Sequence, residues 1–159
     1  MIRECLESDF KTIYEIVNDA AQAYRGVIPD DCWNEPYMSR EELRCEIEAG
    51  VRFAGFERDG RLLGVMGEQD VQDVTLIRHA YVAAAFRGSG IGAALIRHLQ
   101  AKANRRLLVG TWAAATWAIR FYERHGFRLH TAEESEALLR RYWRISDRQI
   151  ETSVVLSDD

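Results

Sequence analysis

The stretch Arg87-Gly88-Ser89-Gly90-Ile91-Gly92 decides the fold, because it joins two segments with different hydrophobic periodicity. Before it, the run from Val74 to Val82 is rich in branched residues and predicts a β-strand. After it, apolar residues recur at helical spacing from Ile91 to about Asn104 and predict a helix. Glycines between a strand and a helix let the backbone approach a ligand closely, and the helix N-terminus favours an anion. The stretch therefore predicts a loop suited to phosphate, with Arg87 adding a full positive charge.

Four interpretations of this loop can be compared with the surrounding residues. One is a tight turn that binds nothing. A P-loop requires Gly-Lys-Ser/Thr, and that triplet does not occur. Gly88, Gly90 and Ala93 match the dinucleotide-binding fingerprint, but the acidic residue expected about 20 positions later is missing around Trp112. The fourth is a loop for the pyrophosphate of an acyl-coenzyme A, so the loop alone leaves the ligand open.

The segments on either side of the loop predict a layered α/β or α+β fold. A helical stripe runs from Phe10 to Tyr24, and a capping box at Ser39 opens a second helix that ends at Gly50. Two strand-like runs joined through Asp59-Gly60 have the pattern of a hairpin. Such an order indicates one sheet with helices packed against it. The predicted strands are 51–57, 61–70, 74–82, 107–111, 127–130 and 149–156, with a further helix over 116–125.

Length and composition indicate one domain over residues 1–159. With 47% hydrophobic residues, the chain can bury a core without a disulfide or a metal. The formal net charge of −4 argues against a nucleic-acid binder, and no run is apolar enough for a membrane span. Cys5, Cys32 and Cys45 lack metal-binding spacing and predict reduced thiols of a cytoplasmic protein, without a metal site. The charged N-terminal residues are unlike a signal peptide.

A second motif follows in the stretch Ala118-Ile119-Arg120-Phe121-Tyr122-Glu123-Arg124-His125-Gly126-Phe127. Together with Arg87, Gly90 and Gly92, which fit Arg/Gln-x-x-Gly-x-Gly/Ala after a strand, it resembles the GNAT superfamily of N-acetyltransferases. The resembling part runs from Val74 to Phe127, and the rest of the chain agrees in element order. The resemblance implies an α/β (α+β) fold: a mixed, mainly antiparallel sheet flanked by helices, with a splayed central strand pair.

The resemblance also implies acetyl-coenzyme A as co-substrate and assigns its binding to main-chain groups. The backbone of Ala80, Tyr81 and Val82 would hold the pantetheine arm and polarise the acetyl carbonyl, which becomes an oxyanion during attack. Tyr122 matches the family's general acid, which protonates the departing thiolate; without the motif it would be a core aromatic residue. The pyrophosphate would lie on the backbone of Arg87, Gly88, Ser89, Gly90, Ile91 and Gly92.

Two departures from the family pattern bear on the mechanism. Ala115 stands where many members have an asparagine that contacts the cofactor. Gly110 stands where some members, including those that resemble ribosomal-protein acetyltransferases, have a glutamate base. The general base must therefore come from elsewhere. Glu68 is the first candidate, while Asp70, His79 and water stay open.

The acceptor pocket is expected to come from the proline-bearing segment. Tyr24, Trp33 and Tyr37 are predicted to wall it or, equally, to pack over the sheet. The expected activity is transfer of an acetyl group from acetyl-coenzyme A to a primary amine of a small molecule or peptide, by direct attack in a ternary complex. The alternatives are an acyl-coenzyme A-binding module with little or no turnover and a dinucleotide-dependent oxidoreductase. A homodimer is open, and neither nucleic acid nor membrane is an expected partner.

Overall fold

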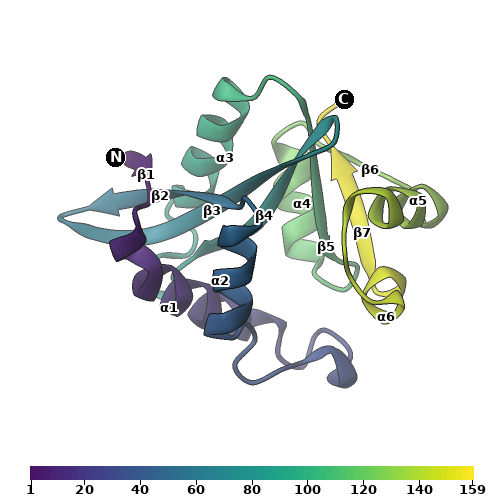
Figure 1. Ribbon diagram of the computed structural model, residues 1–159, viewed down its shortest axis with the longest axis horizontal. Helices are drawn as coiled ribbons and strands as arrows, with labels where there is room; N and C mark the ends of the chain where they lie inside the picture. Colours follow the sequence, from purple (N-terminus) through teal and green to yellow (C-terminus); the bar gives the residue numbers. More distant parts are fainter.

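Seven strands form one mixed sheet in the order β1-β2-β3-β4-β5-β7-β6. The computed structural model describes all residues 1–159, and β4 and β5 are the only parallel pair in the sheet (Figure 1). The expected mixed, mainly antiparallel sheet flanked by helices is thereby confirmed. The strands are β1 (Ile2–Glu4), β2 (Arg52–Arg58), β3 (Arg61–Val71), β4 (Val74–Val82), β5 (Arg106–Trp112), β6 (Arg128–Leu129) and β7 (Ser153–Ser157).

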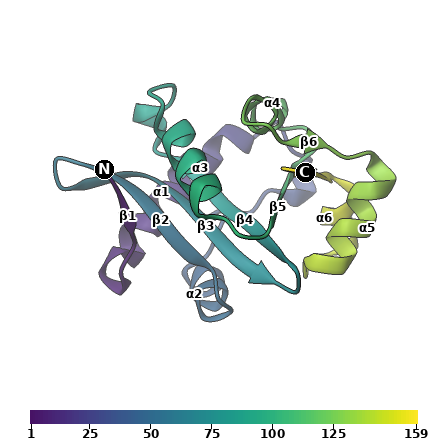
Figure 2. The same cartoon turned by 90° about the horizontal axis from the view of Figure 1, so that it is seen from above.

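Helices cover both faces of this sheet (Figure 2). The helices are α1 (Phe10–Ala20), α2 (Arg40–Glu48), α3 (Ile91–Lys102), α4 (Thr116–Arg124), α5 (Ala132–Tyr142) and α6 (Asp147–Glu151). On one face α1 and α2 pack against the β2–β3 hairpin around Val17 and Leu43. On the other face α3 and α4 meet in a core around Leu95. The helices α5 and α6 lie on the same face of the sheet as α2 and pack against β7 around Leu139. None of these helices has the length and apolar character that crossing a membrane requires.

The parallel strand pair separates partway along its length. β4 and β5 are paired from Val74 with Arg106 to Ile77 with Val109, and no pairing follows. β5 stays paired with β7 as far as Trp112, so it diverges from β4 together with β7. The second half of β4 therefore has no strand neighbour on its β5 side. The expected splay between the two central strands is confirmed.

A β-bulge in β4 lies beside this gap. Where β3 advances by two residues, from Val65 to Gly67, the paired segment of β4 advances by three. His79 takes up the irregularity with a φ of 54°, a left-handed value that is uncommon outside glycine. As a result the adjacent side chains of Arg78 and His79 both contact Glu46 of α2, instead of pointing to opposite faces.

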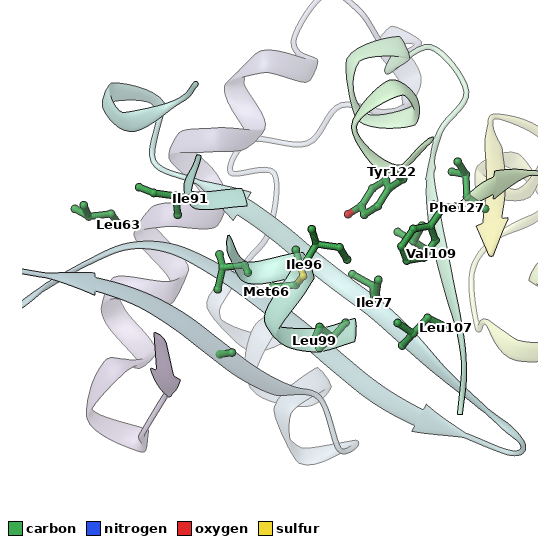
Figure 3. Close-up of a cluster of buried hydrophobic side chains, with 13 residues drawn as sticks. Leu63, Met66, Ile77, Ile91, Ile96, Leu99, Leu107, Val109, Tyr122 and Phe127 are labelled. Carbon is green, nitrogen blue, oxygen red and sulfur yellow. The ribbon is translucent and has the colours of Figure 1, made fainter. Parts of the chain in front are cut away.

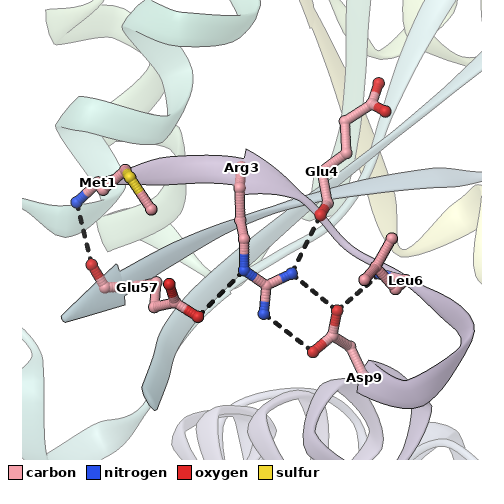
Figure 4. A network of polar contacts seen from close by, with 6 residues as sticks. All are labelled: Met1, Arg3, Glu4, Leu6, Asp9 and Glu57. Atoms are coloured by element: carbon pink, nitrogen blue, oxygen red, sulfur yellow. Dashed lines mark hydrogen bonds and ion pairs between the residues drawn. The ribbon is translucent and has the colours of Figure 1, made fainter. Parts of the chain in front are cut away.

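The first strand is held to the hairpin by one arginine (Figure 4). The Arg3 guanidinium donates two hydrogen bonds to Asp9, at 2.8 and 3.0 Å, and a third to Glu57 at 3.1 Å. The Asp9 carboxylate also accepts from the backbone N–H of Leu6. Hydrogen bonding to Arg3 lowers the pKa of Asp9 below its ordinary value. These contacts hold the N-terminal strand at the edge of the sheet, away from the separated β4–β5 pair.

Two local expectations were wrong in their bounds. The first α-helix ends at Ala20 and is followed by a 3-10 turn over Ala21–Tyr24, so Tyr24 lies outside the helix. The last strand begins at Ser153, because residues 147–151 form α6. The Ser146 side chain caps that helix by accepting a hydrogen bond from the backbone N–H of Gln149.

Candidate active site

A cavity of about 510 Å³ opens between β4, α3 and α4. The sequence predicted nine cofactor-binding residues, and eight of them line it: Ala80, Tyr81, Val82, Arg87, Gly88, Gly90, Ile91 and Gly92. Tyr122 lines the same cavity. We call it the cofactor cavity, and it is the one place where both sequence motifs meet.

The glycine loop forms the mouth of the cofactor cavity by adopting left-handed backbone. Gly88 and Gly90 have φ values of 80° and 85°, which residues with a Cβ reach only at a cost in free energy. Gly90 is the N-cap of α3 and supplies no side chain to the helix terminus. The first N–H groups of α3 are thus left for another acceptor, and the helix dipole favours an anion there.

Two neighbours of these glycines shape the loop without reaching the ligand space. The Ser89 hydroxyl donates a hydrogen bond to the backbone carbonyl of Phe86, and Ser89 does not line the cavity. A Cβ at Gly92 would approach the ring of Phe121 to 3.3 Å. The missing side chain therefore allows α3 and α4 to lie close together at the start of α3.

Tyr122 projects from α4 toward the sheet. Its ring packs against Phe121 and Phe127, with centroid distances of 5.1 and 5.5 Å. Its hydroxyl makes no hydrogen bond within the protein, and in Figure 3 it points away from Phe127 and Val109. Burial raises the pKa of Tyr122 above its ordinary value of 10.0. The hydroxyl is therefore protonated at neutral pH and free to donate.

A second cavity, of about 790 Å³, lies on the α2 side of the sheet. It is lined by the bulge residues Arg78 and His79, by Glu42 and Glu46 of α2, and by Trp112 at the end of β5. The segment between α5 and α6 closes its outer side with Arg144, Ile145 and Ser146. We call it the opposite cavity, because it shares no lining residue with the cofactor cavity and both include residues from the splayed part of β4.

The most concentrated polar cluster in the opposite cavity is formed by Glu46, His79 and Arg78. The Glu46 Oε2 and His79 Nε2 atoms are 2.7 Å apart, and the Arg78 guanidinium pairs with the other carboxylate oxygen. Burial alone would raise the pKa of Glu46, but hydrogen bonding to His79 and the charge of Arg78 outweigh it and hold the pKa below 4.5. The His79 imidazole stacks against the rings of Phe53 and Tyr81, with centroid distances of 6.3 and 6.5 Å. These two contacts keep the imidazole ring in place.

Sequence reasoning named His79 among its alternatives but missed Glu46. The available signal was the N-cap at Ser39, whose side chain accepts a hydrogen bond from the backbone N–H of Glu42 at the start of α2. Glu42 and Glu46 are one turn apart and so lie on one face of the helix. The contact itself depends on the bulge in β4, because 33 residues separate Glu46 from His79.

The structure places Glu68 away from both motifs. Its carboxylate pairs with Lys102 at 2.9 Å and with Arg52 at 3.3 Å, in a third cavity at the C-terminal end of α3. Asp70 lies on the same side of β3, where it accepts a hydrogen bond from the Thr75 hydroxyl at 2.7 Å. Strand alternation puts both carboxylates on the α3 face, toward the end of α3 that lies far from the glycine loop. Glu68 does not line the cavity that contains Tyr122.

The three aromatic residues predicted for the acceptor pocket do cluster, but on different sides. The ring centroids of Tyr24 and Tyr37 are 5.5 Å apart, and those of Trp33 and Tyr37 are 5.7 Å apart. Tyr24 lines the cofactor cavity, whereas Tyr37 lines the opposite cavity. The Tyr37 hydroxyl accepts a hydrogen bond from Trp112 Nε1 at 2.8 Å. Trp33 lines neither cavity and packs against the small core around Ile28.

The two departures from the family pattern have local structural counterparts. Ala115 is fully buried at the N-cap of α4, which receives no side-chain hydrogen bond there. At Gly110, a Cβ would approach the indole ring of Trp143 to 3.3 Å. The Trp143 ring therefore occupies the space into which a side chain at Gly110 would project.

Comparison with known proteins agrees with this geometry. The sequence model described as an acetyltransferase (GNAT) domain matches residues 15–141. No curated protein matches the sequence. Solved structures with a similar fold include PaiA N-acetyltransferase from Thermoplasma acidophilum in complex with coenzyme A, with 16% identity, a TM-score of 0.71, and coverage of 100% of this chain and 98% of that chain.

Two further structures are similar over comparable lengths. A GNAT family acetyltransferase from Elizabethkingia anophelis with acetyl-CoA bound has 19% identity and a TM-score of 0.68, covering 99% of this chain and 95% of that chain. The ribosomal-protein-S18-alanine N-acetyltransferase from Escherichia coli has 18% identity and a TM-score of 0.69, covering 99% and 91%. Identities this low show the fold, whereas the domain match spans most of the sequence. The chain belongs to the GNAT acetyltransferase family.

Proposed function

We propose that the protein transfers an acetyl group from acetyl-coenzyme A to a primary amine, by direct attack in a ternary complex. The observation that carries this proposal is the pair of cavities on opposite faces of the splayed β4–β5 pair. One cavity has the glycine loop and the other has a carboxylate–imidazole pair. Such an arrangement suits a reaction in which acetyl-coenzyme A binds on one side of the sheet and the amine approaches its acetyl carbon from the other side.

The cofactor cavity would receive acetyl-coenzyme A through main-chain groups. The pyrophosphate would accept hydrogen bonds from the glycine loop and the N-terminus of α3, with Arg87 adding charge. The pantetheine arm would lie along the unpaired edge of β4 at Ala80, Tyr81 and Val82. Two structures with a similar fold contain coenzyme A or acetyl-CoA, which supports this assignment.

The transfer step then needs one acid and one base. The amine nitrogen forms a bond to the acetyl carbon, and the electron pair of the carbonyl bond moves to the oxygen. The carbon–sulfur bond then breaks as the carbonyl re-forms. An N–H group of the β4 edge would stabilise that oxyanion. The departing thiolate would take the Tyr122 proton, and the amine would lose its proton to a base.

For the base we propose His79, held by Glu46. If the Nε2 proton is donated to Glu46, the lone pair on Nδ1 is left to accept a proton from the amine. The negative charge of Glu46 stabilises the imidazolium that results. Glu68 is the weaker candidate, because two cations already pair with it in another cavity.

A module that binds acyl-coenzyme A without efficient turnover is the second candidate. It is favoured by Ala115 and Gly110, which lack the side chains that contact cofactor or act as base in other members. Tyr122 and the His79–Glu46 pair argue for turnover instead. We also propose that residues 1–159 act as one acetyltransferase domain, in the cytoplasm, and we leave the oligomeric state open.

The test is an amine-panel assay that follows release of the coenzyme A thiol. Small amines, amino acids and short peptides are each added to the protein with acetyl-coenzyme A. Thiol release that depends on the amine, with acetylated product by mass spectrometry, is expected. Binding of coenzyme A without turnover of any amine would favour the second candidate.

A further inference from the structure

We infer that the acceptor is an amine that also bears a carboxylate, an amino acid or a close analogue, and that Arg144 recognises the carboxylate. This inference rests on the proposed function and names its substrate class. It is carried by the charges that line the opposite cavity.

One of these charges is a guanidinium without a partner. Arg144 is an exposed residue that lines the opposite cavity and makes no hydrogen bond or ion pair in the protein. The neighbouring arginines of the same segment are paired: Arg140 with Asp147, Arg141 with Asp73, and Arg148 with Asp31. The unpaired guanidinium presents the planar donor geometry that matches a carboxylate.

The other charges of the cavity do not satisfy Arg144. Glu46 is neutralised by Arg78 and is hydrogen-bonded to His79. Glu42 also lines the cavity and has no ion pair or side-chain hydrogen bond. Burial and the nearby Glu46 carboxylate raise the pKa of Glu42. Because Arg78 and Glu46 pair with each other, the Glu42 carboxylate and the Arg144 guanidinium are the two charged groups of the cavity that have no ion-pair partner.

This balance fits an acceptor with one positive and one negative group. An amine arrives as an ammonium ion, which Glu42 attracts, and it must lose a proton to react, which His79 can accept. A carboxylate on the same molecule would pair with Arg144. The second ammonium group of a diamine would be repelled by the Arg144 guanidinium. A simple amine has no carboxylate to pair with Arg144.

The shape of the cavity agrees with a small molecule. Its volume of about 790 Å³ lies within the range of small-ligand sites, which is about 300–1,000 Å³. Tyr37 and Trp112 add aromatic surface to the lining, and the hydrogen bond from Trp112 Nε1 to the Tyr37 hydroxyl holds both rings in place. A side chain of the acceptor could pack there.

The test compares matched acceptors with and without the carboxylate. Phenylalanine is paired with phenethylamine, methionine with 3-(methylthio)propylamine, and 1,4-diaminobutane serves as the diamine. The unmodified protein is expected to give a higher kcat/KM for the amino acid of each pair. Arg144→Gln should lower kcat/KM for the amino acids about tenfold and leave the decarboxylated amines within twofold, because only the former lose a hydrogen bond to a charged group.

Arg128→Gln is the matched control, since Arg128 is an exposed, unpaired arginine of β6 that lines none of the three cavities described above. Arg128→Gln removes the same charge and should leave kcat/KM for every acceptor unchanged. The inference is overturned if decarboxylated amines are the better acceptors, or if Arg144→Gln affects both members of a pair equally. Preference for 1,4-diaminobutane that is lost in Glu42→Gln would also overturn it, while leaving the proposed function in place. Absence of turnover with every amine would instead refute the proposed function, and the inference with it.

Discussion

Tyr122 belongs to the hydrophobic core and is also the general acid that we propose. Its ring is 5% exposed and belongs to the core cluster on the α3 face. Its hydroxyl has no partner in the protein and lines the cofactor cavity. A hydroxyl that has no partner in the protein, on a residue that lines a cavity, is left to donate a hydrogen bond to a ligand.

We expect Tyr122→Phe to lower kcat by roughly 10²-fold, the scale of general-acid catalysis. KM for acetyl-coenzyme A and the free energy of unfolding should change little, because the ring is retained. Steady-state thiol-release kinetics and urea unfolding measure the two effects. Tyr14→Phe is the control, because it also removes a hydroxyl that makes no hydrogen bond, from a residue of α1 that lines none of the three cavities. Unchanged turnover in Tyr122→Phe would remove Tyr122 from the mechanism.

Glu46 gives a prediction about pH. Its pKa in the folded protein lies below the ordinary value of 4.5, so the unfolded chain binds more protons between these two pKa values. The stability that this carboxylate contributes is therefore complete above pH 4.5 and is lost as the pH falls through the folded pKa.

We expect Glu46→Gln to cost about 1–3 kcal/mol of unfolding free energy at pH 7, on the scale of a hydrogen bond to a charged group. The difference from the unmodified protein should shrink toward pH 3. Urea unfolding across this pH range measures it. Glu48→Gln, an exposed and unpaired carboxylate of the same helix, should show no such trend. A difference that is constant with pH would contradict the assignment.

At the scale of elements, the bulge in β4 is what joins α2 to the site. It turns Arg78 and His79 to the same face, where Glu46 can contact both. The bulge fits closely against Gly67 of β3, since a Cβ there would lie 2.6 Å from the Arg78 carbonyl oxygen. A backbone atom of a paired strand cannot move out of the way without changing the bulge.

Gly67→Ala should therefore destabilise the protein by about 1–3 kcal/mol, the usual cost of overpacking. It should also lower kcat/KM for the acceptor and leave KM for the cofactor nearly unchanged, because the displaced residues line the opposite cavity. Gly110→Ala is the control, since its Cβ would meet only side-chain atoms, none closer than 3.3 Å. Equal losses in both variants would argue against a special role for the bulge.

At the scale of the whole molecule, the sheet separates two cavities. The cofactor cavity lies among β4, α3 and α4, and the opposite cavity lies toward α2 and the α5–α6 segment. The charged residues that line each cavity do not show the acidic excess of the whole chain, whose net charge is −4. The glycine loop and Arg87 can hold a pyrophosphate in an acidic protein, because these groups act within a few ångströms while distant surface charge is screened.

Coenzyme A at about 100 times its Kd should raise Tm by about 5–10 °C, from a binding contribution of about 2.7 kcal/mol. NAD at the same concentration should produce no shift, which separates a coenzyme A site from a dinucleotide site. Arg87→Gln should reduce the coenzyme A shift. Differential scanning fluorimetry measures these shifts, and stabilisation by NAD alone would contradict the assignment.

The amino-acid order alone predicted the layered fold and named most of the cofactor-binding candidates that line one cavity. Both rest on local signals: the strand, glycine loop and helix are contiguous, and Tyr122 follows in a motif with fixed spacing. The residues that we propose for the acceptor side could not be found in this way. Glu46, His79 and Arg144 come from α2, β4 and the segment after α5, and no periodicity relates them.

Only tertiary structure brings these residues to one cavity, through the β4 bulge and the splay of β5. It also makes Glu68 the weaker candidate for the base, because strand alternation and two nearby cations hold its carboxylate in another cavity. Backbone-mediated binding is encoded in short contiguous stretches, since a glycine pattern is enough to shape a loop. Recognition by side chains depends on contacts between distant segments, and those are decided by packing.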